Sequence, residues 1–174
     1  MSSQPVVAPF GSWQSPITAD LVASEAMKVS DVRLVGDEVL WSEMRPAEGG
    51  RYAVVRCSPE GEMEDVVPPS FNARTRVHEY GGAPFAVAGQ TIYASRFEDQ
   101  RLYGVEPGRA PRPITPEGPY RYADGIADLQ RGRVICDRED HRRDGDPVNT
   151  LVAVPTDGAS PPQVLVSGAD FYAS

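Results

Sequence analysis

The stretch Asn72–Phe85 gathers side chains that can hydrogen-bond, form ion pairs or titrate, and it reads NARTRVHEYGGAPF. Within seven residues it holds two arginines, a histidine, a glutamate and a tyrosine: Arg74, Arg76, His78, Glu79 and Tyr80. A histidine beside a carboxylate could act as a base for proton transfer. The same residues could hold a peptide substrate, and we take the five of them as the candidate substrate-binding set.

A structural role is the interpretation that we favour for this set, because charged clusters in proteins are often structural ion-pair networks. In that role His78 is a buried donor that joins one β-sheet to the next. Arg74 or Arg76 then neutralises Glu79, and Glu79→Ala should destabilise the fold. If the set faces substrate instead, the same change should lower catalytic efficiency and leave melting unchanged.

A complete active site is not evident in the sequence. The nucleophile elbow of an α/β-hydrolase needs the pattern G-x-S-x-G, and the nearest stretch, residues 158–162, reads GASPP and lacks the final glycine. The only two histidines are His78 and His141. His78-Glu79 does not continue into H-E-x-x-H, and neither the cysteine spacing of a metal site nor a phosphate loop is present. We therefore expect no catalytic residue, metal or cofactor in this chain.

Charge and composition narrow the classes of partner. The formal net charge is −8 and basic residues are interleaved with acids, which argues against nucleic acid because phosphate binding needs a clustered basic face. No apolar run approaches the length of a membrane span. The first residues, MSSQPVVAPFGSW, lack the features of a secretory signal, so we predict a cytoplasmic protein. For the same reason Cys57 and Cys136 are expected to be free thiols.

The elements that must position the candidate set are mostly short strands. Residues 1–28 form an N-terminal arm with one short helix, because Ser15 or Thr18 can cap the helix formers LVASEAMK. Residues 29–174 then show four-strand units at 29–69, 70–117 and 118–168, and Phe171-Tyr172 looks like the approach to a fourth unit. The expected strands of the three units are Val32–Val35, Val39–Glu43, Tyr52–Cys57 and Val66–Val67; Phe85–Val87, Thr91–Ser95, Leu102–Val105 and Pro113–Ile114; and Gly125–Asp128, Arg133–Cys136, Leu151–Val154 and Val164–Val166.

The repeat of these units predicts an all-β fold that is part of a β-propeller, with about three four-stranded blades and the short N-terminal helix. A period of roughly 45–50 residues lies in the range of propeller blades. Propellers close with about four to eight blades, so three blades leave an open ring. Apolar strands such as Val39–Trp41 and Leu151–Val154 are then expected to lose cover. A β-sandwich of short strands is the alternative fold.

Several motifs occur in an order that resembles a known family: FGSWQSPIT, VLWSEMRPAEGGR, RTRVHEYGG, FEDQRLY, RYADG, REDH and PVNTLVAV. The sequence is similar over essentially its whole length to the N-terminal part of bacterial prolyl oligopeptidase family serine peptidases, closest to the aminopeptidase and acylaminoacyl-peptidase-like members. The resemblance implies that an N-terminal propeller caps a C-terminal α/β-hydrolase domain with a Ser-Asp-His triad. It also implies that the partners of this chain are that domain and a peptide substrate.

Three functions remain open at this point. The first is the propeller segment of a serine peptidase, which gates access to a hydrolase domain outside this chain and helps to position peptides. The second is a stand-alone, propeller-like module that binds a protein partner without catalysis. The third, which we favour least, is an independent enzyme built on His78 and Glu79.

Overall fold

The computed structural model describes residues 7–12, 15–25 and 27–172. The short N-terminal helix is α1 (Ala19–Glu25), and the Thr18 hydroxyl caps it by accepting a hydrogen bond of 3.1 Å from the Leu21 amide. Residues 1–6 and Trp13 of the expected arm lie outside the described residues. Within those residues, no helix combines the length and apolar character needed to cross a membrane.

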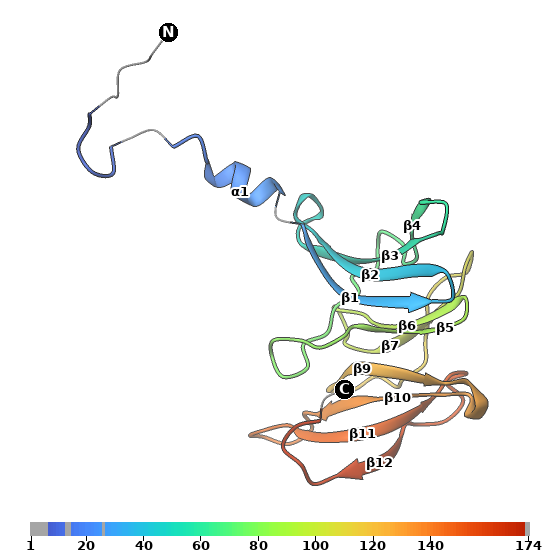
Figure 1. Ribbon diagram of the computed structural model, residues 1–174. Coiled ribbons are helices and arrows are strands. Elements are labelled where there is room, and N and C mark those ends of the chain that lie inside the picture. Colours follow the sequence, from blue (N-terminus) through green and yellow to red (C-terminus); the bar gives the residue numbers. More distant parts are fainter. Residues whose placement is uncertain (1–6, 13–14, 26, 173–174) are drawn as a thin grey trace.

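The remaining elements form three antiparallel sheets of four strands each, in chain order (Figure 1). This architecture confirms the all-β fold of propeller-like blades. The first sheet contains β1 (Lys28–Val35), β2 (Glu38–Arg45), β3 (Arg51–Cys57) and β4 (Met63–Asp65). The second contains β5 (Phe85–Ala88), β6 (Thr91–Ser95), β7 (Leu102–Val105) and β8 (Arg112–Pro113). The third contains β9 (Tyr120–Asp128), β10 (Arg133–Asp140), β11 (Val148–Pro155) and β12 (Gln163–Ser167). Two 3-10 turns, η1 (Pro46–Glu48) and η2 (Leu129–Arg131), lie between strands.

Glycine-bearing turns set the register of the first two hairpins. Val35 pairs with Glu38 around Gly36-Asp37, and Ala88 pairs with Thr91 around Gly89-Gln90. Gly36 and Gly89 have φ angles of 61° and 60°, the left-handed region that tight hairpin turns require. In the third hairpin η2 forms the turn between the paired residues Asp128 and Arg133, where the expected strands end and begin.

Strand positions were predicted well at strand centres and less well at the fourth strands of the first two sheets. The fourth strand of the first sheet is Met63–Asp65, earlier than the expected Val66–Val67, because Val67 is buried in the core as the chain turns. The fourth strand of the second sheet is Arg112–Pro113, and Ile114 packs into the core. The strands of the third sheet extend beyond the predicted ends.

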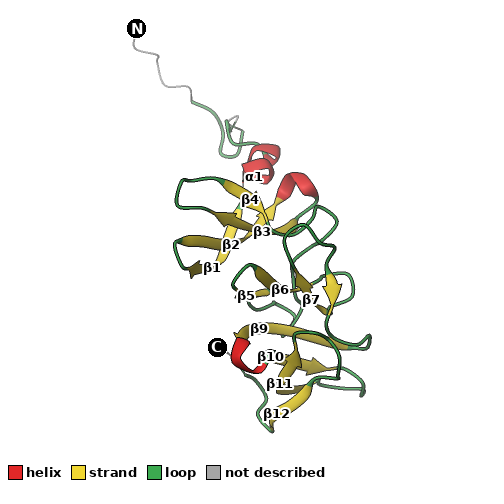
Figure 2. Ribbon diagram, turned by 90° about the vertical axis from the view of Figure 1, so that its right-hand side faces the viewer, coloured by secondary structure: helices red, strands yellow, loops and turns green. Residues whose placement is uncertain are grey.

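Figure 2 shows the second sheet between the first and the third. The buried side chains form two core layers, one on each face of this middle sheet. Alternation along β6 divides its side chains between the layers: Ile92 packs with Leu40 and Val54 of the first sheet, while Tyr93 packs with Val134 and Val152 of the third. Burying one such aliphatic side chain contributes roughly 1.5–3 kcal/mol. The middle sheet is therefore covered on both faces.

The strands at Val39–Trp41 and Leu151–Val154 were expected to expose their apolar side chains, and they are more buried than predicted. Leu40, Val152 and Val154 are fully buried because they face the middle sheet. Exposed apolar side chains are found instead on the first strand of the first sheet and the last strand of the third. They are Val29, Val32 and Leu34 of β1, and Val164, Leu165 and Val166 of β12.

Cys57 and Cys136 lie in different sheets and are both free thiols, as predicted. Burial raises the pKa of the Cys136 thiol well above its usual range, so it stays protonated and packs as a small apolar group.

Candidate functional site

The candidate set lies on residues 66–84, the connector between β4 and β5, which we call the long connector. Its middle is extended, and burial alternates along it: Ala73, Thr75 and Val77 point into the protein, while Arg74 and Arg76 are exposed. The alternation of small or apolar residues with arginine fixes which side chains face outward.

Asn72 and Arg74 join the first sheet to the second. The Tyr52 amide donates to Asn72 Oδ1 at 2.9 Å, and the Phe97 amide donates to Asn72 O at 2.9 Å. The Arg74 guanidinium lies 5.3 Å from the Tyr52 ring and 5.0 Å from the Phe97 ring. Such stacking contributes roughly 0.5–1 kcal/mol at exposed sites.

Past Val77 the long connector makes a strained turn that reaches the third sheet. His78 and Glu79 have φ angles of 55° and 64°, an uncommon conformation for residues other than glycine. The His78 amide donates to Glu139 Oε1 at 2.6 Å, and His78 Nδ1 lies 3.2 Å from the same oxygen. Glu139 belongs to β10, so this turn bypasses the second sheet and contacts the third.

The double glycine allows the close approach that follows the turn. A Cβ on Gly82 would lie 2.6 Å from Asp124 Oδ2 and 3.0 Å from the Ala123 Cβ, so no larger residue fits without a shift. Gly81 has a φ of 89°. Next to them the Ala83 amide donates to Asp124 Oδ1 at 2.9 Å, and the Asp124 amide donates to Ala83 O at 3.0 Å.

Glu139 is the centre of the charged network, which we call the junction cluster: His78, Glu79, Arg121, Glu139 and His141. The Glu139 side chain is 2% exposed. Its Oε2 lies 2.9 Å from His141 Nε2 and 3.6 Å from Arg121 Nη1. Three groups of positive or donor character thus surround one buried carboxylate, which satisfies a charge that would otherwise be costly to bury.

Arg121 is the partner of Glu79, and the expected pairing with Arg74 or Arg76 was wrong. Arg121 Nη1 donates to Glu79 Oε1 at 2.6 Å and to Arg76 O at 2.7 Å. This hydrogen bond holds the pKa of Glu79 below its usual range. The Glu79 side chain is nevertheless 77% exposed, so the buried carboxylate of the junction is Glu139 and not Glu79.

Asp137 and Asp124 form an acidic pair beside the junction cluster. Burial raises the pKa of Asp137 to about 6, the nearby Asp124 adds to the rise, and His78 opposes it. Asp137 Oδ2 is buried and accepts no hydrogen bond from the described residues. This carboxyl group can therefore take up a proton in mildly acidic solution.

The five candidate residues do not share one pocket. Arg74 and Tyr80 line a cavity of about 300 Å³ between the first sheet and the long connector, together with Lys28 and Asp31. Arg76 lines a different cavity of about 270 Å³, beside His141. Tyr80 is 82% exposed, and its ring centroid lies 5.7 Å from that of His78.

The sequence did not predict that four further charged residues belong to this site: Arg121, Asp124, Asp137 and Glu139. Arg121 and Asp124 belong to the motif RYADG, Glu139 belongs to REDH, and Asp137 directly precedes REDH; both motifs place charged residues in strands. Arg121 pairs with Glu139, and Ala123 with Asp137, in the β9–β10 register, so the two motifs are neighbours in space.

Comparison with solved structures identifies the class of protein. A puromycin hydrolase is 40% identical over 87% of this chain, with a TM-score of 0.77. A puromycin-hydrolysing peptidase of Mycobacterium tuberculosis is 34% identical over 97% of this chain, with a TM-score of 0.85. These matches confirm the resemblance to the propeller part of prolyl oligopeptidase family peptidases. More particularly, the chain is homologous to the propeller region of puromycin-hydrolysing peptidases.

The extent of these matches matters for function. The chain spans 25% and 28% of the two peptidases, which are larger proteins in which this region is joined to further domains. A nidogen/laminin complex structure, 16% identical with a TM-score of 0.56, shows a likeness of fold alone. No family model and no curated protein matches the chain.

Proposed function

We propose that this chain forms the first blades of the propeller of a serine peptidase, and that this propeller gates and helps to position peptide substrates for an α/β-hydrolase domain of the same protein. The observation that carries the proposal is the 34–41% identity to puromycin-hydrolysing peptidases over most of the chain. The whole protein would then cleave aminoacyl amides such as puromycin, with aminopeptidase specificity. The cytoplasmic location stays a prediction.

The geometry supports different roles for members of the candidate set. Glu139 anchors His78, and Arg121 holds Glu79, so these residues shape the turn. Arg74 and Tyr80 border a cavity, which supports a role for these two members in peptide contact. We therefore assign positioning of the turn to His78 and Glu79, and substrate contact to Arg74 and Tyr80.

Comparison of residues 1–174 with the full-length gene product tests this proposal. Both are treated with a serine-directed fluorophosphonate probe and assayed for puromycin hydrolysis. We expect labelling and turnover by the full-length product and neither by residues 1–174, since these lack the G-x-S-x-G pattern. Turnover by the shorter chain, or a full-length product without serine-dependent activity, would contradict the proposal.

A further inference from the structure

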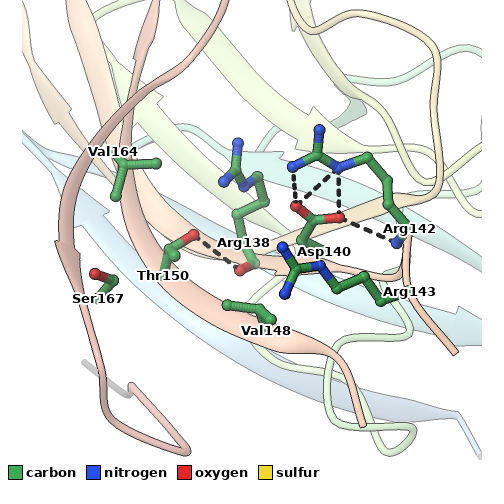
Figure 3. Close-up of a pocket in the computed structure, with 8 residues that line it drawn as sticks. All are labelled: Arg138, Asp140, Arg142, Arg143, Val148, Thr150, Val164 and Ser167. Atoms are coloured by element: carbon green, nitrogen blue, oxygen red, sulfur yellow. Dashed lines mark hydrogen bonds and ion pairs between the residues drawn. The ribbon is translucent and has the colours of Figure 1, made fainter. Parts of the chain in front are cut away.

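A cavity of about 540 Å³ opens on the third sheet, next to residues 141–147 (Figure 3). Its volume is in the range of small-molecule sites, roughly 300–1,000 Å³. It shares no residue with the junction cluster, and the proposed peptidase function does not account for it. The residues that line it are Arg138, Asp140, Arg142, Arg143, Val148, Thr150, Val164 and Ser167.

The lining carries an excess of positive charge although the whole chain is acidic. Asp140 is the only carboxylate among the lining residues. The Arg142 guanidinium already pairs with it and donates hydrogen bonds of 2.6, 2.9 and 3.0 Å. Within the described part of the chain, no carboxylate forms an ion pair with Arg138 or Arg143. Asp144 and Asp146 belong to the same loop and do not line the cavity. Arg138 and Arg143 therefore have no direct ion-pair partner among the described residues, although the charge of Arg138 helps to lower the pKa of Asp140.

Arg138 is held in place without using its hydrogen-bond donors. Its guanidinium carbon lies 5.2 Å from the centre of the Tyr120 ring, which the Arg142 guanidinium also contacts at 5.5 Å. Arg138 Nε is buried, and no described group accepts a hydrogen bond from it. A buried donor without a partner is costly. A side chain already ordered by stacking loses little further entropy when a ligand accepts hydrogen bonds from its other N–H groups.

We propose that this cavity binds a small organic anion, whose carboxylate or phosphate oxygens accept hydrogen bonds from Arg138 and Arg143. Planar guanidinium groups pair with both oxyanions through parallel N–H···O bonds. The apolar part of the ligand contacts Val148 and Val164, which border the same space and are about half exposed. Those apolar walls favour an organic anion over an inorganic ion of the same charge.

Calorimetric titration of the 174-residue chain tests the proposal with four probes. N-acetyl-leucine and phenyl phosphate carry the two oxyanions on an apolar body, N-acetyl-leucinamide lacks the charge, and inorganic phosphate lacks the body. We expect one or both organic anions to bind, with affinity falling as salt rises, and the amide and inorganic phosphate to bind at least tenfold more weakly. The tighter of the two organic anions shows whether the cavity prefers a carboxylate or a phosphate.

Substitutions assign the binding to the cavity. Arg138→Gln and Arg143→Gln should each weaken binding by roughly tenfold or more, since a hydrogen bond to a charged group contributes about 1.5–3 kcal/mol. Arg131→Gln is the matched control, because Arg131 is an exposed arginine of the same sheet outside the cavity. The Arg131→Gln variant should bind the organic anion as tightly as the wild type does.

If Arg138→Gln fails to fold, Arg143→Gln still tests the proposal, because Arg143 is an exposed loop residue. Equal binding of acid and amide, no binding of either organic anion, or unchanged affinity in both variants would overturn the proposal.

Discussion

Two connectors perform the same topological task in this molecule and differ in what they contact. The long connector, residues 66–84, joins the first sheet to the second. The short connector, residues 114–119, joins the second to the third. The short one takes a direct path: Ile114 packs in the core and Thr115 binds the neighbouring strand. The long one packs between two sheets and then contacts a third through His78.

The difference shows what the additional residues of the long connector contribute. The direct link has positive φ only at a glycine, Gly118, and it carries no buried charge. The long connector differs in both respects, with His78 and Glu79 in the left-handed region and Glu139 buried beneath them. Strained backbone of this kind costs about 1–3 kcal/mol per residue and persists where the surroundings enforce it. Because it clusters at functional sites, this turn is the part of the chain most worth testing.

The largest expected effect comes from breaking the attachment of the long connector to the third sheet. Glu139→Ala leaves His78, Arg121 and His141 without the carboxylate they surround, and removing one partner of a buried pair costs about 3–5 kcal/mol. Urea unfolding of the chain measures the loss. Glu117→Ala is the matched control, since Glu117 lies on the short connector with its side chain 88% exposed. Equal stability of the two variants would mean that the junction cluster does not hold the fold together.

Filling the space at the double glycine should have the next largest effect. Gly82→Ala places a Cβ 2.6 Å from Asp124 Oδ2, and overpacking of this kind costs typically about 1–3 kcal/mol. Gly104→Ala provides the control, because a Cβ there meets its nearest atom, in the Tyr93 ring, at 3.6 Å. In thermal unfolding, the melting temperature of Gly82→Ala should be well below that of Gly104→Ala. The reverse order would show that the long connector tolerates a looser approach to the third sheet.

A smaller effect, dependent on pH, is expected at Asp137. The folded chain holds the Asp137 proton up to a pKa of about 6, while the unfolded chain releases it near 3.8. Between these values the folded state binds more protons, so this contribution stabilises at low pH and is lost as pH rises through about 6. Asp137→Asn removes this pH-dependent contribution. The melting temperature of the variant, relative to that of the wild type, should therefore rise between pH 4 and pH 7.

The control for this prediction is Asp146→Asn, at an exposed position in the loop 141–147. Its melting temperature should differ from that of the wild type by a constant amount over the same pH range. A constant difference for Asp137→Asn as well would show that the Asp137 carboxyl titrates alike in the folded and unfolded chain.

The fold could be predicted from the sequence because its signals are local. Gly36 and Gly89 determine two hairpin turns, and the alternation along strands such as β6 determines which face each residue occupies. The fourth strands of the first two sheets were misplaced because Val67 and Ile114, though apolar and β-branched, leave the strand and enter the core. Core packing overrides strand preference at those positions.

The candidate site could be predicted only in part because its contacts are distant in sequence. The importance of the stretch around His78 was evident from its composition, and so was the need for a pairing partner. The partner of Glu79 is Arg121, and the partner of His78 is Glu139. These pairs exist only because β9 and β10 lie next to the turn once the third sheet has formed, and no local pattern encodes that proximity.

The smallest effect on stability, and the sharpest test of function, is expected at Glu79. Glu79→Ala was expected to destabilise the fold by leaving a buried partner without its counter-charge. Its side chain is 77% exposed, and exposed ion pairs contribute little. We now expect the melting temperature of Glu79→Ala to match that of Glu117→Ala, its exposed counterpart on the short connector.

The same two variants of the full-length protein then distinguish a positioning role of Glu79 from direct contact with substrate. If Glu79 only pairs with Arg121, both variants should retain the kcat/KM of the wild type for puromycin. A selective loss of kcat/KM in Glu79→Ala, at unchanged melting temperature, would place this carboxylate at the substrate and overturn the positioning role that we assign to it.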